Sequence, residues 1–216
     1  KKTDIEISAF ISSWIAYGSR VQIIKTLNKI HQEFLESPTN YIKEKKYQHY
    51  QNQEQCLYRF YQEKDFFQLC ETLHTIFFEE NFSCLEDKIQ SLVCQKPTTI
   101  EVLEAITKIF PNQKGIPQNT KSACKRLCLF LRWMIRKNSE VDFGIWNILQ
   151  EKDLIIPLDT HVFRISKQLG LTNRKQADML SAIQITNKLK ITFPDDPLLG
   201  DYALFGYGVK HQEKTK

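Results

Sequence analysis

Apolar residues recur at intervals of three and four along most of this chain, which is the spacing of an amphipathic helix. The pattern is clearest over residues 5–17, 19–35, 98–110, 120–137 and 175–191. Glycine and proline are scarce, with 7 of each among 216 residues, so a turn-dense all-β chain is disfavoured. The sequence therefore predicts an all-α fold.

Several of these helices carry signals at their ends. Gly18 and Ser19 break the first apolar stretch into two helices, and Thr98 with Glu101 has the spacing of a capping box. Ser83 is predicted to cap a short helix, and a further helix is expected over residues 55–78. Asp159 is predicted to open another helix, which Leu169-Gly170-Leu171 ends.

The length and an apolar fraction of 42% indicate one globular domain that spans residues 1–216. Its basic residues are concentrated in the second half. Residues 114–175 hold twelve Lys and Arg against five Asp and Glu, a net charge of +7, whereas the whole chain carries +5. We expect the N-terminal helices 1–110 and the basic half 111–216 to form the two sides of a cleft that receives a polyanion.

The six cysteines show no C-x-x-C pair and no spacing typical of zinc or iron–sulfur sites. We expect reduced core residues, no metal and no cofactor. Lys1 and Lys2 precede an apolar run in the manner of a signal peptide, but Asp4 and Glu6 interrupt it and no cleavage motif follows. The sequence predicts a cytoplasmic, nucleoid-associated protein without a membrane span, and a start that has been trimmed.

Four cations in the basic half share one face of the predicted helix 120–137. They are Lys121, Lys125, Arg132 and Arg136, and apolar side chains occupy the opposite face. Residues 115–136 contain no acid that would relieve their mutual repulsion. A phosphate backbone would neutralise such a stripe, although a solvated helix face has the same pattern.

Asp159 follows the apolar, proline-containing run Ile155-Ile156-Pro157-Leu158 and precedes an amphipathic helix. Alone, this arrangement is typical of an ordinary helix cap. The longer run Pro-Leu-Asp-Thr-His-Val-Phe-Arg-Ile at 157–165, however, resembles the signature of the helix-hairpin-helix DNA glycosylases of the endonuclease III superfamily.

The whole chain is also similar to a bacterial family of hypothetical proteins related to that superfamily, from residues 4–7 and 16–20 through 125–134 to 200–208. The resemblance implies a two-lobed helical glycosylase-like domain. Its usual L-P-G-V-G hairpin is missing, with Gly115-Ile116-Pro117 as a degenerate relic, so an atypical hairpin is implied, as in archaeal 8-oxoguanine glycosylases. The superfamily's C-terminal four-cysteine cluster is absent, so no iron–sulfur centre is expected.

The resemblance also implies a catalytic pair. Asp159 matches the catalytic aspartate, and Lys125 is the preferred match for the lysine of bifunctional members, with Lys121 as the alternative nucleophile. A Schiff base at the sugar C1′ requires a neutral amine, which neighbouring cations favour, and a carboxylate opposite it stabilises positive charge on the sugar.

An enzyme that acts on a base within a duplex must flip that base into a pocket. We expect the pocket to be lined by Trp133, Phe143, Trp146 and Tyr207, and the DNA to be contacted by Arg20, Arg132, Arg136 and Arg164. The favoured function is a monomeric glycosylase, with lyase activity, on double-stranded DNA that carries a damaged base. A non-catalytic nucleic-acid-binding module of the same fold and a helical protein-interaction domain are the alternatives.

Overall fold

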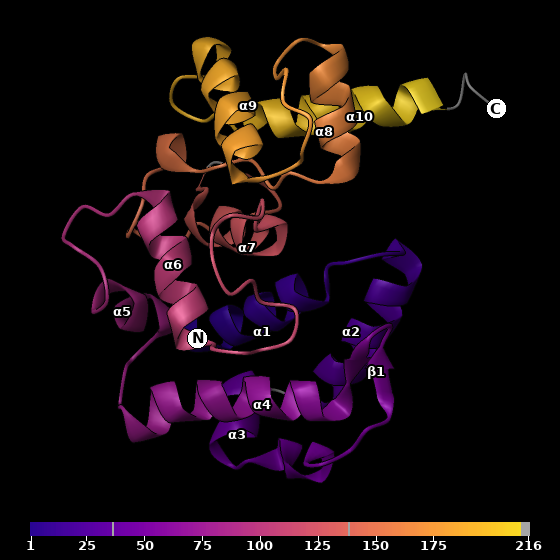
Figure 1. The fold of residues 1–216 in the computed structure, drawn as a ribbon. Coiled ribbons are helices and arrows are strands. Elements are labelled where there is room, and N and C mark those ends of the chain that lie inside the picture. Colours follow the sequence, from indigo (N-terminus) through magenta and orange to yellow (C-terminus); the bar gives the residue numbers. More distant parts are fainter. Residues whose placement is uncertain (36, 138, 213–216) are drawn as a thin grey trace. The chain divides into compact units, whose positions relative to one another are not determined.

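The computed structural model describes residues 1–35, 37–137 and 139–212 (Figure 1). Helices account for most of the described residues, and the two short strands β1 (Cys56–Tyr58) and β2 (Tyr61–Gln62) form an antiparallel hairpin. The coarse all-α prediction is confirmed, with this hairpin as an addition to it. No helix in the described ranges combines the length and the hydrophobicity that crossing a bilayer requires.

The chain divides into two compact units. Unit 1 comprises Lys1–Gln95 and Ala105–Gln118, and unit 2 comprises Lys96–Glu104 together with the described residues from Asn119 onward. Helix α6 (Thr99–Ile109) begins in unit 2 and ends in unit 1. Its N-terminus has the predicted capping box, because Glu101 accepts from the Thr98 amide at 2.7 Å and Thr98 Oγ1 accepts from the Glu101 amide at 3.3 Å.

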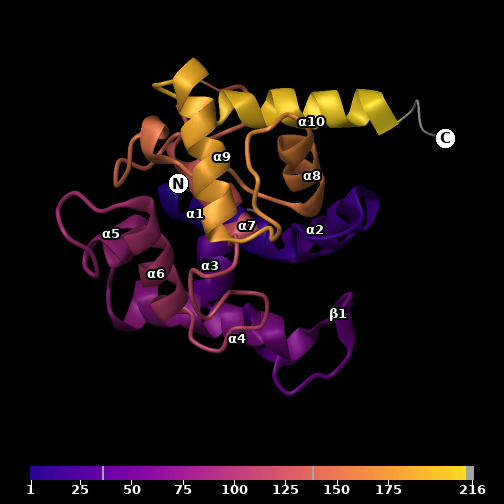
Figure 2. The same ribbon diagram turned by 45° about the horizontal axis from the view of Figure 1, so that its top comes forward.

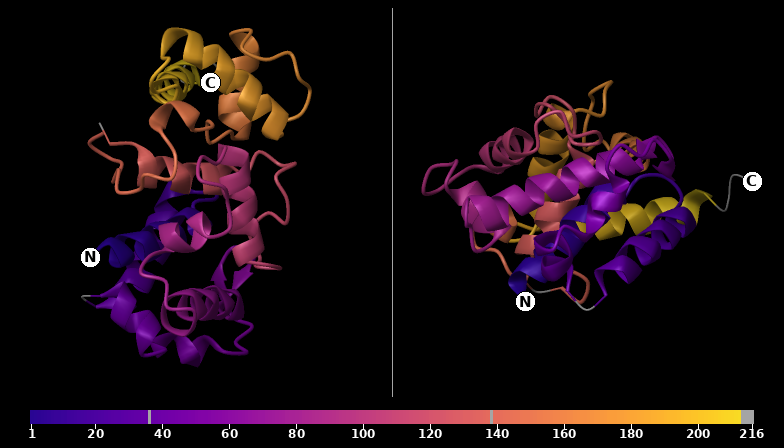
Figure 3. Two further views of the ribbon diagram at one scale, coloured as in Figure 1. Left: turned by 90° about the vertical axis from the view of Figure 1, so that its left-hand side faces the viewer. Right: turned by 90° about the horizontal axis from the view of Figure 1, so that it is seen from below.

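Unit 1 is built from helices around an aromatic core. Its helical elements are α1 (Lys2–Ile15), α2 (Arg20–Phe34), α3 (Pro38–Lys43), the 3-10 turn η1 (Lys46–Tyr50), α4 (Glu63–His74), the π-helical turn η2 (Thr75–Glu79) and α5 (Leu85–Gln90). Helix α3 packs against α1, α2 and α4, and Figure 3 shows these helices from below. In the core Phe10 stacks on Phe110 at 4.5 Å, and Trp14 stacks on Tyr61 at 4.3 Å between ring centroids.

The expected helix 55–78 begins later than predicted. The β1–β2 hairpin takes its first residues, and α4 starts only at Glu63, where Gln62 and Asp65 form a capping box. Tyrosines at positions 58 and 61 suit a strand that buries one face. Tyr61 is buried against Gly115, where an added Cβ would lie 2.1 Å from the Tyr61 hydroxyl and the backbone has φ +88°. Only glycine fits that position.

Unit 2 contains α7 (Lys125–Ile135), the 3-10 turn η3 (Glu151–Asp153), α8 (Thr160–Gln168), α9 (Met179–Thr192) and α10 (Leu199–Gln212). Helices α8 and α10 pack against each other, and with α9 they form the orange and yellow group in Figures 1 and 2. Trp146 is fully buried and packs edge-on against Phe130 of α7 at 5.1 Å.

Two cysteines depart from the prediction of buried thiols. Cys56 and Cys94 are exposed, whereas Cys70, Cys84, Cys124 and Cys128 are buried, and all six are free thiols. Burial raises the pKa of Cys70 and Cys128 well above its usual range, so these two buried thiols are poor nucleophiles. They serve as small apolar core residues.

Candidate functional site

Lys125 is the first residue of α7, because the chain turns sharply before it. Cys124 has the left-handed conformation, with φ +46° and ψ +35°, and Ser122 pairs with Asp178 in an isolated β-bridge. A helix cannot continue through a left-handed residue. The predicted helix start at residue 120 is therefore wrong, and the Lys125 side chain projects from the helix terminus.

Asp159 is the N-cap of α8, as the sequence predicts. Its backbone is extended, with φ −112° and ψ 178°, and Oδ1 accepts from the amide of Val162 at 2.7 Å. Because that bond uses one carboxylate oxygen, the other is free to face a second group. The buried run 154–158 before it holds this carboxylate in place at the end of the helix.

The two helix starts bring Lys125 and Asp159 together. Nζ of Lys125 lies 3.2 Å from Oδ2 of Asp159, with side-chain exposures of 39% and 31%. Both groups belong to unit 2, and both are half-buried, so a solute has access to them. An amine and a carboxylate at this distance can exchange a proton, and the amine can act as a nucleophile when it is neutral.

Lys121 lies outside the helix and is exposed. Its backbone is fixed, since its carbonyl accepts from the Met179 amide at 3.2 Å and its amide donates to Oδ1 of Asn119 at 3.0 Å. The stripe of four cations along one helix therefore does not exist as predicted. Of the two candidate nucleophiles, Lys125 is the one in the ion pair with Asp159.

Arg132 and Arg136 are buried rather than solvent-facing, with exposures of 8% and 3%, so their predicted role as DNA contacts is wrong. Both bind the fully buried carboxylate of Asp142, Arg132 at 3.3 Å and Arg136 at 2.7 Å. Arg136 also pairs with Asp196 at 2.8 Å. Buried guanidinium groups require such partners. These ion pairs connect α7 to the segment between α7 and η3, which holds Asp142, and to the segment between α9 and α10, which holds Asp196.

Asp201 is an acidic residue near the pair that sequence reasoning missed. It lies in the first turn of α10 and accepts from Arg132 Nη1 at 3.1 Å, and Arg132 also donates to the Tyr202 hydroxyl. Burial raises its pKa to about 6; the Arg132 charge opposes this shift and the Asp159 charge adds to it. The signal available in the sequence was an acid between Gly200 and Tyr202 at the start of an apolar stretch.

Among the other predicted DNA contacts, Arg20 in unit 1 and Arg164 in unit 2 are exposed. The four residues of the expected base pocket have different environments. Trp146 belongs to the core, which corrects its assignment to the pocket, and Trp133 is half-buried on α7. Phe143 and Tyr207 are exposed, at 52% and 42%.

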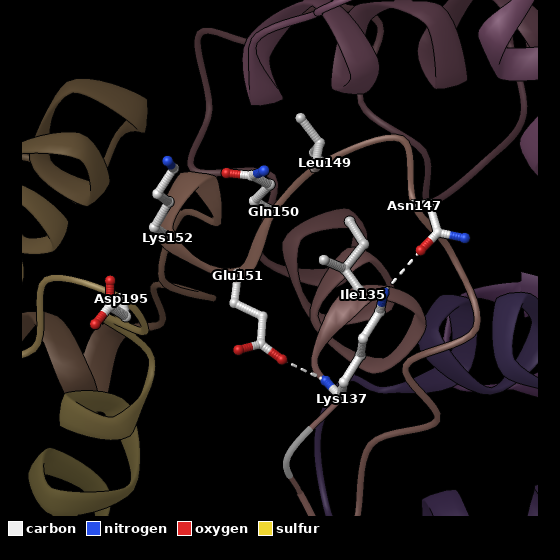
Figure 4. A pocket seen from close by; sticks show the side chains of 8 residues that line it. All are labelled: Ile135, Lys137, Asn147, Leu149, Gln150, Glu151, Lys152 and Asp195. Atoms are coloured by element: carbon white, nitrogen blue, oxygen red, sulfur yellow. Dashed lines mark hydrogen bonds between the residues drawn. The ribbon is translucent and has the colours of Figure 1, made fainter.

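A cavity of about 430 Å³ lies elsewhere in unit 2, near the end of α7. Figure 4 shows Lys137 pointing toward Asn147, to which Nζ donates at 2.7 Å, and Glu151 accepting from the Lys137 amide at 2.5 Å. Lys152 and Asp195 complete its polar rim. Lys125 and Asp159 are not part of its lining.

The model of one protein family, described as "Protein of unknown function (DUF2400)", matches residues 1–210. No curated protein and no solved structure matches the chain.

Proposed function

Because the chain belongs to DUF2400, a family of unknown function, we propose its function from its own residues: it is a DNA glycosylase with lyase activity that removes damaged bases. The substrate class is double-stranded DNA with a damaged base, oxidised purines among them. The site needs neither a metal nor a cofactor, and the protein works in the cytoplasm at the nucleoid.

The observation that carries this proposal is the 3.2 Å approach of the Lys125 amine to the Asp159 carboxylate. Asp159 also belongs to the run Pro-Leu-Asp-Thr-His-Val at residues 157–162, which resembles the glycosylase signature. The starts of two helices that are far apart in the chain bring Lys125 and Asp159 to this distance. The resemblance and the geometry therefore support the same two residues.

The chemistry assigned to the pair is amine attack on the sugar. Nζ of Lys125 forms a bond to C1′ as the glycosidic bond breaks, and the base leaves with the bonding electrons and takes up a proton. Asp159 stabilises the positive charge that develops on the sugar and accepts the proton that the amine loses. The C1′–O4′ bond then breaks, the remaining amine proton passes to O4′, and an imine forms between Lys125 and C1′. Loss of a C2′ proton with cleavage of the C3′–O bond releases the phosphate on the 3′ side, which leaves with the bonding electrons.

The finer fold assignment is part of the same proposal. Along the chain, helix α6 is followed by the loop 110–124, by α7 with Lys125 at its start, and by α8 with Asp159 at its cap. We assign this order of elements to a two-lobed glycosylase-like domain with an atypical helix-hairpin-helix. Gly115-Ile116-Pro117 occupies that loop.

Borohydride trapping tests the proposal. The full chain is incubated with duplex oligonucleotides that carry 8-oxoguanine, uracil or an abasic site, and sodium borohydride reduces any imine to a stable secondary amine. We expect a covalent protein–DNA product with wild type and its loss in Lys125→Ala and Asp159→Asn. Lys121→Ala and Lys175→Ala are the matched controls, since both lysines are exposed, and both variants should form the product.

Strand scission without alkali indicates lyase activity. Scission that appears only after alkali indicates base removal alone. Trapping lost in Lys121→Ala and kept in Lys125→Ala would overturn the assignment of the nucleophile. Binding of duplex DNA with neither base release nor trapping would instead favour a non-catalytic nucleic-acid-binding module.

A further inference from the structure

The β1–β2 hairpin of unit 1 exposes an aromatic ring and a cation at its turn. Tyr58 pairs with Tyr61 across the hairpin, so the turn consists of Arg59 and Phe60 alone. Both tyrosines are buried, at 4% and 0%, whereas Phe60 is 46% exposed and Arg59 is exposed as well. The hairpin is thus anchored by one pair of side chains and presents the other to solvent.

The turn packs on the link between α1 and α2. The ring of Phe60 lies 5.3 Å from that of Tyr17, and the Arg59 guanidinium lies 4.8 Å from the Tyr17 ring centre. Tyr17 is itself 42% exposed, and its carbonyl accepts a hydrogen bond from the Tyr58 hydroxyl. We call Tyr17, Arg59 and Phe60 the hairpin surface.

The backbone makes room for this arrangement at a conformational cost. Gly18 has φ +100°, and a Cβ there would lie 2.6 Å from Nη1 of Arg59. Arg59 has φ +53°, a conformation that residues other than glycine seldom adopt. The tip is therefore a defined structure that displays Phe60 and Arg59.

The two segments that form the hairpin surface carry basic residues and no acids. Residues 7–32 and 55–62 contain no Asp or Glu, and they include Arg20, Lys25, Lys29 and Arg59. The acids that flank the hairpin, Glu54 and Glu63, stand at its opposite end, and Glu54 pairs with Lys64 at 2.7 Å. In the part of the chain that the structure describes, neither Arg20 nor Arg59 has an acidic partner.

Exposed aromatic rings beside arginines that have no acidic partner are the features with which proteins bind unpaired nucleobases and their phosphates. We propose that the hairpin surface binds a single nucleic-acid strand, with an unpaired base stacked on Phe60 and the flanking phosphates contacted by Arg59 and Arg20. This function goes beyond the proposed chemistry, because its residues belong to unit 1 whereas Lys125 and Asp159 belong to unit 2.

Titration of the full chain into a fluorescein-labelled oligothymidylate gives the Kd for a single strand and tests the inference. The same titration with a duplex of equal length and with an oligouridylate provides the comparisons. Phe60→Ala should raise Kd for the single strand by about tenfold, and Phe60→Trp should retain wild-type binding because it keeps a stacking face. Arg59→Ala should make the salt dependence shallower by about one phosphate contact. The uridylate arm tells whether DNA or RNA is preferred.

Leu92→Ala and Lys108→Ala are the matched controls, since Leu92 is 47% exposed and Lys108 is exposed on α6. Both should bind as wild type does. A Kd unchanged in both Phe60→Ala and Arg59→Ala would overturn the inference. Tighter binding to phosphatidylserine vesicles or to polyglutamate than to oligonucleotides would overturn it as well.

Discussion

The amine of Lys125 and the carboxylate of Asp159 lie 3.2 Å apart although their positions in the chain differ by 34. Each is placed by the start of a different helix, and neither is deeply buried. Half-exposed ion pairs add little to folding stability because water competes for both charges. A structural role and a chemical role for this pair therefore predict different behaviour in variants.

Lys125→Ala should change the free energy of unfolding by less than ~1 kcal/mol, since it removes a partly exposed ion pair. The same variant should form no borohydride product with abasic DNA. Urea unfolding and trapping on one preparation provide both values. A large loss of stability, on the order of 3 kcal/mol or more, would show that the lysine holds the fold together and would remove the reason to assign it a chemical role.

Asp159 has two separable tasks, the cap of α8 and the charge opposite Lys125. Asparagine caps helices about as well as aspartate, whereas alanine costs about 1 kcal/mol. Asp159→Asn should therefore keep the wild-type melting temperature but form no trapped product. Asp159→Ala should melt at a lower temperature and also form no trapped product. Thermal melts of the two variants beside their trapping yields check this prediction. Full trapping in Asp159→Asn would mean that the negative charge is not needed.

Asp142 is expected to contribute strongly to the stability of unit 2, because its buried carboxylate bridges Arg132 and Arg136. Asp142→Ala leaves two guanidinium groups short of a partner, which costs about 3–5 kcal/mol when such a pair is buried. Glu140→Ala, an exposed acid two positions away, is the control and should stay within ~0.5 kcal/mol of wild type. Equal unfolding curves for the two variants would contradict the network.

Asp201 should give the protein an unusual pH dependence. Its pKa is raised from 3.8 to about 6 in the folded state, so between about pH 6 and pH 4 the folded protein binds this proton more tightly than the unfolded chain does. Stability from this group therefore rises as the pH falls through that window, by up to about 3 kcal/mol. Asp4 and Asp178, whose pKa values are lowered to about 2, act in the reverse direction below about pH 4.

Urea unfolding between pH 7 and pH 4.5 measures this effect. Asp201→Asn should lack the increase that wild type shows, whatever its absolute stability at pH 7. Parallel curves for the two proteins would mean that Asp201 titrates normally and is better solvated than its 9% exposure indicates.

The sequence predicted those helix ends that depend on residues close by in the chain. The break at Gly18, the capping box of Thr98 and Glu101, and the cap at Asp159 each depend on neighbours within four positions. The start of α7 could not be predicted in this way. It depends on the left-handed Cys124 and on the bridge between Ser122 and Asp178, which lie far apart in the chain.

The burial of Arg132 and Arg136 could not be predicted from the sequence either. Periodicity places Arg132 and Arg136 on the polar side of an amphipathic helix, where exposure is the usual outcome. Their burial depends on Asp142, Asp196 and Asp201, which come from three separate segments. Helical spacing carries no information about such distant partners.

The most direct test of the central claim is the mass spectrum of the reduced protein–DNA product after digestion with protease and nuclease. We expect the sugar remnant to be attached to Nζ of Lys125 and wild type to give no other modified peptide. A remnant on Lys121 or at the N-terminus, or no adduct with any abasic substrate, would contradict it.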